Sequence, residues 1–471
     1  MEVRRRFLLV ALVLSLVPAA SSASVGHSAE VGGDWTRFGY DAARHNAGPA
    51  NTGITAANVG RLRRQRVTLD GTVDASPIYL RGVQIHGARH DAFFVTTSYG
   101  RTIAINAASG ATLWRFTPSG YSSLAGSYRI TNSTPVADPN RKFIYAASPD
   151  GRVHKLSVAS GAEARGWPVR VTLLAQREKL GTSLNFARGL VLLGTGGYVG
   201  DQPPYQGHVV AINASTGGIV HVWNSLCSNV HRLLKPSSSC ADSDSAIWAR
   251  SGVVVVPGSG NLLVATGNGA FDGKLNWGDS ALMLTSNASR LLHNWTPRNQ
   301  ASLESGDVDL GSTAPALIGG YAVQGGKDGK LRLLNLSHLG GRLGATGGEL
   351  QTVTAPGGAD VFTAPAVSGK RLFVATDSGL DCYVLSGGRL QLSWHRAEGG
   401  TSPVVAGGLL YVYNGSLNVY APSTGKLLAT FSAGGSSHWS SPIVTDGRVA
   451  VPEGNANDHR TTGVLDIFRL P

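Results

Sequence analysis

A short phrase recurs along the chain: one or two small polar residues, in most copies a proline, and then an apolar run. Its clear copies are DASPIYL from Asp74, NSTPVAD from Asn132, GSTAPALI from Gly311, VFTAPAVS from Val361, GTSPVVAG from Gly400 and WSSPIVTD from Trp439. Two weaker copies, GTSLNFARG from Gly181 and IWARSGVVV from Ile247, fill the gap after the second and bring the series to eight. Self-similarity at a period of roughly fifty residues is typical of repeat architectures.

Each opening phrase leads into a second apolar run that ends in a glycine-rich turn, as in AFFVTTSYGRTIAINAASG and RLFVATDSGLDCYVLSGG. Short runs of Val, Leu, Ile and Tyr between Gly, Asn, Asp and Ser turns are typical of strands, and patterns with helical periodicity are nearly absent. Four strands in each of eight repeats predict an all-β protein, an eight-bladed β-propeller of four-stranded antiparallel blades.

A tryptophan recurs near the last strand of several repeats. These residues are Trp114, Trp167, Trp223, Trp295 and Trp394. A tryptophan body can fill the wedge between neighbouring blades, while its ring N–H needs one hydrogen-bond partner. We therefore interpret them as core residues.

The two ends of the chain are predicted to close the ring. The segment NVGRLRRQRVTLDG from Asn58 precedes the first repeat and has no copy elsewhere. We expect it to pair with GVLDIFRL near the C-terminus, because a ring with free strand edges is prone to aggregate. Residues 34–471 then form a single propeller domain, with residues 24–33 as a linker.

The N-terminus resembles a secretory signal peptide. Arg4, Arg5 and Arg6 precede the apolar run FLLVALVLSLVPAA, and small residues follow it. This pattern predicts a signal peptide over residues 1–23. The run is short for a membrane span and no second long apolar stretch occurs, so we expect a protein without a transmembrane segment, secreted or periplasmic.

The formal charge of +12 favours anionic partners or reflects a bias towards arginine. Without the signal peptide it falls to about +10, a balance that suits anionic cell-wall polymers, lipids or acidic proteins. No block of clustered basic residues with interleaved aromatic residues occurs, so we expect no nucleic-acid partner.

Three cysteines remain in a compartment that is expected to be oxidising. Cys227 and Cys240 bracket the polar segment SNVHRLLKPSSS and could form a disulfide, whereas Cys382 in GLDCYVL resembles a buried free thiol. No C-x-x-C-H occurs, which excludes covalent haem attachment through that motif.

The turns AINAASGATLW, AINASTGGIVHVW and VYAPSTGKLLATF carry a more specific signal. With them the chain resembles the pyrroloquinoline-quinone (PQQ) repeat family over nearly its whole mature length. That family contains quinoprotein alcohol dehydrogenases and also non-enzymatic propellers such as the outer-membrane assembly lipoprotein. The resemblance therefore implies the fold and leaves two classes of function open.

The resemblance to the dehydrogenases implies a set of site residues. Trp248 resembles the tryptophan that stacks on the quinone, and Asn268, in LLVATGN, resembles the asparagine that binds calcium. Asp307 matches the general base, which also lies at the metal, and Asp309 matches a second acid. Lys327, in QGGKDGK, matches the cation that bonds the quinone oxygens.

The chemistry requires these residue types. Ca²⁺ prefers several oxygen ligands, some of them charged, and acts as a Lewis acid. A carboxylate must reach the substrate hydroxyl, and a cation must stabilise charge on the reduced quinone. The sequence departs from the family at Gln202, where the enzymes have a calcium-binding glutamate. A glutamine oxygen can bind calcium but brings no charge, and the nearby Asp201 lies one residue away from the matching position.

Structural roles for the same residues stay open. Asn268 could be a turn residue with a left-handed backbone, Lys327 an exposed cation at a hairpin tip, and Asp307 a loop cap. The neighbouring Trp277 could cover the channel mouth. His438 could face the channel or have a structural role.

Two functions are therefore compatible with the sequence. The first is an exported dehydrogenase with PQQ and Ca²⁺ that oxidises an alcohol or polymer hydroxyl and passes electrons to a separate acceptor. The second is a non-catalytic propeller that binds a protein or a cell-surface polymer at its loop face, as a binding module or assembly scaffold. Fold alone does not decide between them.

Overall fold

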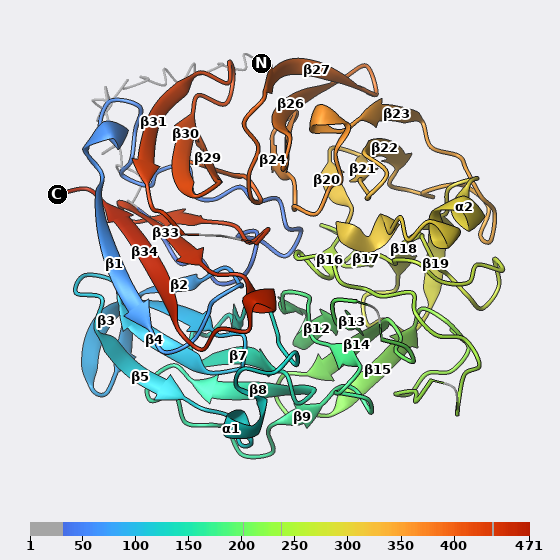
Figure 1. Ribbon diagram of the computed structural model, residues 1–471, viewed down its shortest axis with the longest axis horizontal. Coiled ribbons are helices and arrows are strands. Elements are labelled where there is room, and N and C mark those ends of the chain that lie inside the picture. The colour runs from blue at the N-terminus through green and yellow to red at the C-terminus, as the bar shows by residue number, and fades with distance from the viewer. Residues whose placement is uncertain (1–31, 201, 237, 436–437) are drawn as a thin grey trace, which may run out of the picture. The chain divides into compact units, whose positions relative to one another are not determined.

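The computed structural model describes residues 32–200, 202–236, 238–435 and 438–471. The predicted signal peptide, residues 1–23, and residues 24–31 of the predicted linker lie outside the described residues. The described part contains eight four-stranded antiparallel sheets, which follow one another around a ring (Figure 1). The predicted eight-bladed propeller is confirmed.

The strands of blades 1 to 4 run in chain order from the inner strand to the outer strand. Blade 1 contains β2 (Ile78–Ile85), β3 (Ala88–Thr96), β4 (Thr102–Asn106) and β5 (Thr112–Phe116). Blade 2 contains β6 (Val136–Ala137), β7 (Phe143–Ser148), β8 (Arg152–Ser157) and β9 (Val169–Arg170). Blade 3 contains β11 (Asn185–Ala187), β12 (Leu190–Gly194), β14 (His208–Asn213) and β15 (Ile219–Asn224). Blade 4 contains β16 (Val254–Val255), β17 (Leu262–Ala265), β18 (Ala281–Leu284) and β19 (Leu291–Trp295).

Blades 5 to 7 repeat this order, and blade 8 takes its outer strand from the N-terminal part of the chain. Blade 5 contains β20 (Ala316–Ile318), β21 (Tyr321–Gln324), β22 (Lys330–Asn335) and β23 (Gln351–Thr354). Blade 6 contains β24 (Ala366–Ser368), β25 (Arg371–Thr376), β26 (Gly379–Ser386) and β27 (Arg389–Arg396). Blade 7 contains β28 (Val404–Ala406), β29 (Leu409–Tyr413), β30 (Ser416–Tyr420) and β31 (Leu427–Ser432). Blade 8 contains β32 (Ile443–Thr445), β33 (Arg448–Glu453), β34 (Gly463–Arg469) and β1 (Arg63–Leu69).

A few short elements lie between the strands. They are the two-residue strands β10 (Glu178–Lys179) and β13 (Gly196–Gly197), the helices α1 (Tyr121–Leu124) and α2 (Gln300–Ser305), and the 3-10 helices η1 (Val59–Arg61), η2 (Leu310–Ser312), η3 (Pro356–Gly358) and η4 (Ala456–Asp458). Strands β10 and β13 pair with each other in a small sheet of their own.

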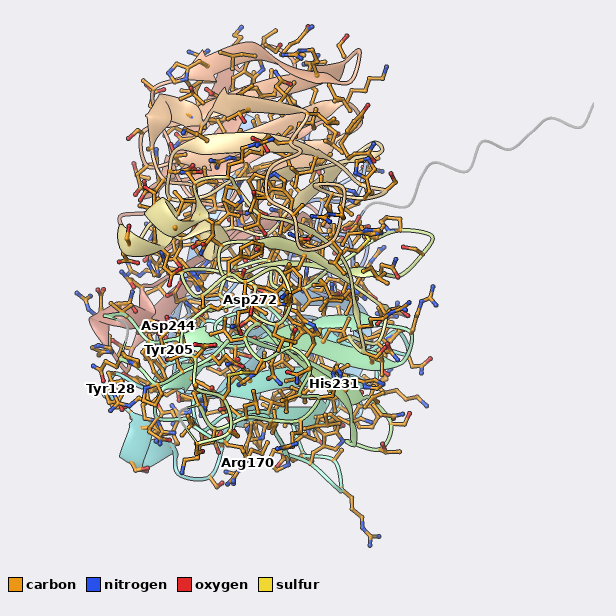
Figure 2. The ribbon with its side chains drawn as sticks, turned by 90° about the vertical axis from the view of Figure 1, so that its right-hand side faces the viewer. Tyr128, Arg170, Tyr205, His231, Asp244 and Asp272 are labelled. Carbon is orange, nitrogen blue, oxygen red and sulfur yellow. A yellow bond between two sulfur atoms is a disulfide. The ribbon has the colours of Figure 1, made fainter. Side chains whose placement is uncertain are left out.

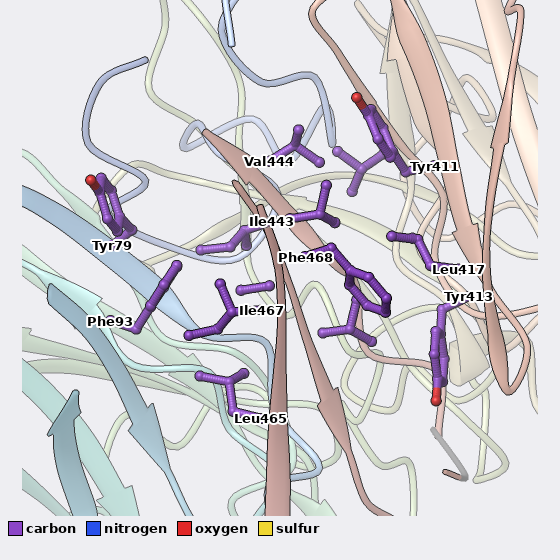
Figure 3. Packing of buried hydrophobic residues seen from close by; sticks show 14 of the residues in the cluster. Tyr79, Phe93, Tyr411, Tyr413, Leu417, Ile443, Val444, Leu465, Ile467 and Phe468 are labelled. Atoms are coloured by element: carbon purple, nitrogen blue, oxygen red, sulfur yellow. The ribbon is translucent and has the colours of Figure 1, made fainter. Parts of the chain in front are cut away.

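The ring closes by pairing of the two chain ends, as predicted. Strand β1 is antiparallel to β34, with Arg63 opposite Arg469 and Leu69 opposite Gly463. The hydrophobic cluster around this joint draws aromatic residues from blade 1, Tyr79 and Phe93, and from blade 8, Phe468 (Figure 3). Because β1 precedes blade 1 in the chain and completes blade 8, this pairing ties the first blade to the last.

The tryptophan near the end of one blade packs against a glycine turn of the next blade. A Cβ atom added at Gly161 of blade 2 would lie 2.6 Å from the Trp114 ring of blade 1, and the Trp114 ring nitrogen donates to the Val158 carbonyl (2.8 Å). Gly425 of blade 7 faces Trp394 of blade 6 in the same way. The glycine is required because its missing side chain leaves space for the indole.

The N-terminal residues 33–52, here called the strap, cross one end of the ring. Trp35 pairs with Tyr79 of β2, and the Ala42 carbonyl accepts from Val255 of β16 (2.9 Å). The Arg44 side chain reaches between the blades and donates to the Leu184 carbonyl before β11 (2.9 Å). No repeat or periodicity predicts this path, because the strap takes its hydrogen bonds from the inner strands of several blades.

Candidate functional site: a cavity between the inner strands

A cavity of about 520 Å³ lies where the chain approaches the inner strands of several blades. Its lining is Asn132, Lys179, Gly181, Gly196, Gly197, Tyr198, Val199, Gly200, Tyr205, Ala246, Trp248, Arg250, Asp307, Asp309, Lys327, Phe362, His438, Trp439 and Asn457. Many of these residues come directly before an inner strand, so the cavity opens towards the end of the ring that the strap does not cross. Among the lining residues, Tyr205 is held by a backbone hydrogen bond, in which its carbonyl accepts from the backbone nitrogen of Asp244 (2.8 Å); both residues are labelled in Figure 2.

One side of the cavity, the acidic wall, consists of Asp307, Asp309 and Lys327. The Lys327 ammonium contacts one carboxylate oxygen of Asp309 and lies 3.3 Å from Asp307 Oδ1. Burial lowers the pKa of Lys327, but Asp309 and Asp307 outweigh it, so the pKa is raised. Lys327 is therefore a cation that lies between the carboxylates of Asp307 and Asp309, the two acids named from the sequence.

Asn268 lies directly behind the acidic wall. Its backbone nitrogen donates to the other oxygen of Asp309 (2.9 Å), and its side-chain nitrogen donates to the Leu303 carbonyl (3.0 Å). The side-chain oxygen is buried without a partner among the described residues. Asn268 is absent from the described residues that have positive φ, so the alternative of a left-handed turn residue is wrong.

Asp307 stands at the mouth of the cavity. Its side chain is 71% exposed, against 11% for Asp309. Its backbone is left-handed, with φ of 51°, a conformation that costs a non-glycine residue about 1 kcal/mol or more. The tight turn that follows α2 places this carboxylate beside Lys327 instead of in the protein interior.

Three aromatic side chains face one another across the cavity. The ring centres of Phe362 and Trp439 lie 4.3 Å apart with an angle of 9° between the planes, so the two rings stack. The Trp248 ring centre lies 6.1 Å from that of Phe362, and Lys327 Nζ lies 5.8 Å from the Trp248 ring centre. All three rings are only half-buried, which leaves aromatic surface for a flat ligand.

The opposite side, the basic wall, consists of Asp74, Lys179 and Arg250 with Asn132 and His438. Arg250 Nη2 lies 3.0 Å from Asp74 Oδ1 and 2.7 Å from His438 Nδ1. The Asn132 amide, oriented so that its nitrogen donates to the Gly181 carbonyl, presents its oxygen to Arg250 Nη2 (3.0 Å) and Lys179 Nζ (3.2 Å). Two cations therefore share one amide oxygen, and only Arg250 is paired with the Asp74 carboxylate.

Burial sets the protonation of this wall. It lowers the pKa of Lys179, the charge of Arg250 lowers it further, and Asp74 offsets this only in part, so that the pKa falls to about 8. For Asp74, burial raises the pKa, but Arg250 and His438 outweigh it and the pKa is lowered. The pKa of His438 is lowered by burial despite Asp74.

The predicted residues are thus brought together in part. Trp248, Asp307, Asp309 and Lys327 line one cavity, and Asn268 supports it from behind. Gln202 does not line it: the side chain is exposed and its oxygen accepts from Arg177 Nη1 (2.8 Å). Asp201 lies outside the described residues.

Trp277 does not cover the channel mouth. It is buried in the blade 4 core, and its ring nitrogen donates to Ser228 Oγ (3.0 Å). This prediction is wrong because the loop before β18 folds back as a β-bridge between Phe271 and Trp277.

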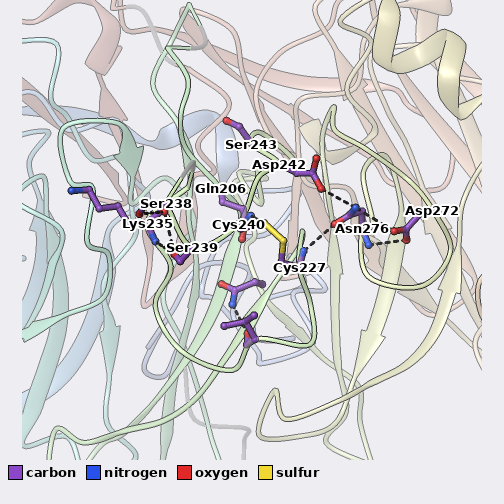
Figure 4. Close-up of a disulfide and its surroundings, with 12 residues drawn as sticks. Gln206, Cys227, Lys235, Ser238, Ser239, Cys240, Asp242, Ser243, Asp272 and Asn276 are labelled. Carbon is purple, nitrogen blue, oxygen red and sulfur yellow. Dashed lines mark hydrogen bonds between the residues drawn. A yellow bond between two sulfur atoms is a disulfide. The ribbon is translucent and has the colours of Figure 1, made fainter.

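Cys227 and Cys240 form the predicted disulfide (Figure 4). Cys382 is a buried free thiol. Within the described residues, the single group of three potential metal ligands contains these two cysteines and Asp242, away from the cavity. Since both sulfurs are bonded to each other, this group is not a metal site.

His438 lines the cavity, one of the two roles considered for it, but the rest of the basic wall was missed by sequence reasoning, although part of its signal is present. Asp74 and Asn132 open two of the repeated phrases, and Arg250 follows Trp248 by two residues in another. Because that phrase leads into the inner strand of each blade, its polar positions are candidates for the channel. Lys179 lies outside the phrase and carries no such signal.

Fold and cavity together define the class of protein: an eight-bladed β-propeller with one cavity lined by polar and aromatic residues from six blades. The family model described as outer membrane protein assembly factor BamB matches residues 66–225 and 343–466, more than half of the chain. The chain belongs to this family of PQQ-type repeats, and the predicted resemblance is confirmed.

Individual relatives include quinoprotein dehydrogenases. Over 213 residues the chain is 28% identical to the quinohemoprotein alcohol dehydrogenase ADH IIB of Pseudomonas putida, a match that spans 43% of this chain and only 28% of that enzyme's length. The structure of the quinohemoprotein alcohol dehydrogenase from Comamonas testosteroni superposes with a TM-score of 0.69 at 15% identity, over 93% of this chain and 80% of that one. A europium-containing methanol dehydrogenase gives the same TM-score and identity, over 93% of this chain and 98% of its own. At 15% identity these structural likenesses establish the fold.

Within the described residues, no helix has the length and apolar character needed to cross a bilayer.

Proposed function

We propose that the cavity binds a flat, carboxylate-bearing quinone of the PQQ class and that the protein uses it to oxidise the hydroxyl group of an alcohol or polymer. The observation that carries this proposal is convergence. Trp248 precedes the inner strand of blade 4, whereas Asp307 and Lys327 belong to the blade 5 region, and all three line a single cavity. In this proposal the chain is exported by its signal peptide, and electrons leave to a separate acceptor.

The residues present fit a flat anionic quinone. The half-buried ring of Trp248 offers an aromatic face, and Lys327 lies beside that ring. Lys179 and Arg250 on the basic wall supply positive charge for carboxylate groups. Aromatic faces combined with cations on two sides favour a planar anion over an aliphatic ligand.

The same residues do not fit calcium. The unpartnered oxygen of Asn268 suits a metal ligand, but Ca²⁺ takes about six to eight oxygens, several of them from carboxylates. Both oxygens of Asp309 already have partners, Asn268 and Lys327. Gln202 bonds to Arg177 and does not line the cavity. The proposed reaction therefore has no step that uses calcium.

A bound quinone supplies a two-electron acceptor. The exposed carboxylate of Asp307 accepts the proton of a substrate hydroxyl that enters at the mouth of the cavity. Lys327 stays protonated, because Asp309 raises its pKa, and stabilises negative charge next to Trp248. The stacked Phe362 and Trp439 rings form an apolar side that excludes water.

A second function is favoured by a specific observation. The missing calcium ligands, together with the family's description as an outer membrane assembly factor, support a propeller that binds a protein or a cell-surface polymer without chemistry. In that case the cavity is a recognition site at the loop face.

The test is a titration of the purified protein with PQQ, with and without Ca²⁺, followed by tryptophan fluorescence and by dye reduction with a panel of alcohols. We expect saturable quenching that does not require Ca²⁺ and is lost in Trp248→Ala. A matched control is Trp394→Phe, since Trp394 is also half-buried but packs between blades 6 and 7. That variant should bind as the wild type does.

The outcomes separate the two functions. Binding with alcohol-dependent dye reduction supports the dehydrogenase. Binding without turnover supports a recognition site, and no saturable quenching in the wild type rejects the quinone.

A further inference from the structure

Lys179 points into the cavity because of a short sheet. Strand β10 pairs with β13 so that Glu178 lies opposite Gly197 and Lys179 opposite Gly196. Side chains alternate along a strand. Glu178 accordingly turns into blade 3, where its carboxylate lies 3.1 Å from His208 Nε2, and Lys179 turns to the other side, where it lines the cavity.

The Lys179 amine has no carboxylate partner. None of the ion pairs among the described residues includes it, and it donates to the Asn132 amide oxygen at 3.2 Å. The Asp74 carboxylate is taken by Arg250 and by His438 (2.9 Å). Lys327, in the same cavity, lies between two carboxylates. One cavity thus contains two lysines with opposite surroundings.

The surroundings give the two amines different protonation. Burial and Arg250 lower the pKa of Lys179 to about 8, whereas the carboxylates raise the pKa of Lys327. At pH 7 about one tenth of a group with a pKa of 8 is neutral, against about 0.03% of an ordinary lysine. Desolvation beside another cation is a known way to make a lysine nucleophilic.

We propose that Lys179 forms an imine with an aldehyde that enters the cavity, so that the protein has a carbonyl-binding site of its own. The amine nitrogen attacks the carbonyl carbon, and the carbon–oxygen double bond is replaced by a carbon–nitrogen double bond. The two nitrogen protons end on the oxygen, which leaves as water, so no oxidant or reductant is needed. Aromatic aldehydes are the favoured class, because Trp248, Phe362 and Trp439 line the same cavity.

Arg250 is a positioning residue in this proposal. It shares the Asn132 oxygen with Lys179 and brings a fixed positive charge that opposes protonation of the amine. Asp74 and His438 hold its guanidinium in place. The site does not depend on a quinone, because the condensation takes place without electron transfer.

The experiment is reductive trapping. The purified protein is incubated with benzaldehyde and sodium cyanoborohydride between pH 6 and 9.5, and the modified lysines are mapped by peptide mass spectrometry. At pH 7 we expect Lys179 to be modified at least about tenfold faster than the exposed Lys370, since its neutral fraction is larger by about two orders of magnitude. That ratio should fall as the pH rises above 8.

Lys327 is the internal control, because the reagent reaches it through the same cavity. Lys327→Arg should leave the labelling of Lys179 intact, and Lys179→Arg should abolish the fast labelling. Label that follows exposure alone, or that favours Lys327, overturns the proposal. So does a wild-type protein in which Lys179 is labelled only after denaturation. A failed quinone titration leaves this result unaffected, so the two proposals can fail separately.

Discussion

The two walls of the cavity use the same kinds of side chain in opposite proportions. The acidic wall has two carboxylates, Asp307 and Asp309, around one ammonium, and most of Asp307 is exposed. The basic wall has two cations, Lys179 and Arg250, around one carboxylate, and it is buried. The number of carboxylates within reach decides whether the pKa of a lysine is raised or lowered. Burial decides how much of the free energy of unfolding depends on the ion pair.

The largest expected effect is on the basic wall. Asp74→Ala should lower the free energy of unfolding by about 3–5 kcal/mol, because it leaves the buried Arg250 without its carboxylate. The measurement is urea unfolding at pH 7. Asp70→Ala is the matched control: Asp70 pairs with Arg101 at 2.8 Å, but its side chain is 41% exposed, so a loss below about 1 kcal/mol is expected.

A double variant sharpens this result. Asp74→Ala combined with Arg250→Met removes both charges, and it should recover part of the stability that the single variant loses. Equal losses in Asp74→Ala and Asp70→Ala would contradict the burial argument for the basic wall.

The next effect is a pH dependence with opposite signs on the two walls. The pKa of Lys179 is about 8 in the folded protein and about 10.5 unfolded, so the unfolded state binds more protons between these values. Stability from Lys179 therefore rises with pH from about 8 to 10.5. Lys179→Met should remove a rise of about 3 kcal/mol from the free energy of unfolding measured in urea across this window.

Lys327→Met should change the pH dependence in the other direction. The pKa of Lys327 is raised, so its stabilisation is present at neutral pH and is lost as pH rises through the folded-state value. At pH 7 we expect a loss of about 1 kcal/mol, because Asp309 keeps its bond from Asn268 and Asp307 stays in water. If the free energy of unfolding changed with pH in the same direction in both lysine variants, the two walls would not affect the pKa values of their lysines in opposite directions.

The propeller could be predicted from the sequence because each blade carries its own local signal. The repeated phrase, the glycine turn and the blade-ending tryptophan recur within roughly fifty residues, as expected of repeat proteins. Even ring closure follows, since a segment without a copy has to pair with the last repeat. The strap is different: its contacts, such as Ala42 with Val255, are non-local and have no periodicity.

The candidate site could be predicted only where its residues are near one another in the chain or follow a family order. Asp307, Asp309 and Lys327 form such a group. The basic wall joins Asp74, Arg250 and other residues that are far apart in sequence, so only the closed ring brings them together. At Gln202 family order was insufficient, because the loop directs this side chain to Arg177.

The smallest effect on stability is expected at Asp307, and it separates the functions best. Asp307→Asn keeps a residue type that tolerates the left-handed backbone and leaves Lys327 paired with Asp309, so the free energy of unfolding should change by less than about 0.5 kcal/mol. If Asp307 is the base, dye reduction falls by about 10²–10⁴-fold while quenching by PQQ is retained. Asp377→Asn, on an exposed residue outside the cavity, should change neither quantity. A large loss of stability in Asp307→Asn would instead show that this carboxylate stabilises the fold. The stability of the protein would then depend on the ion pairs of the acidic wall, as it does on those of the basic wall.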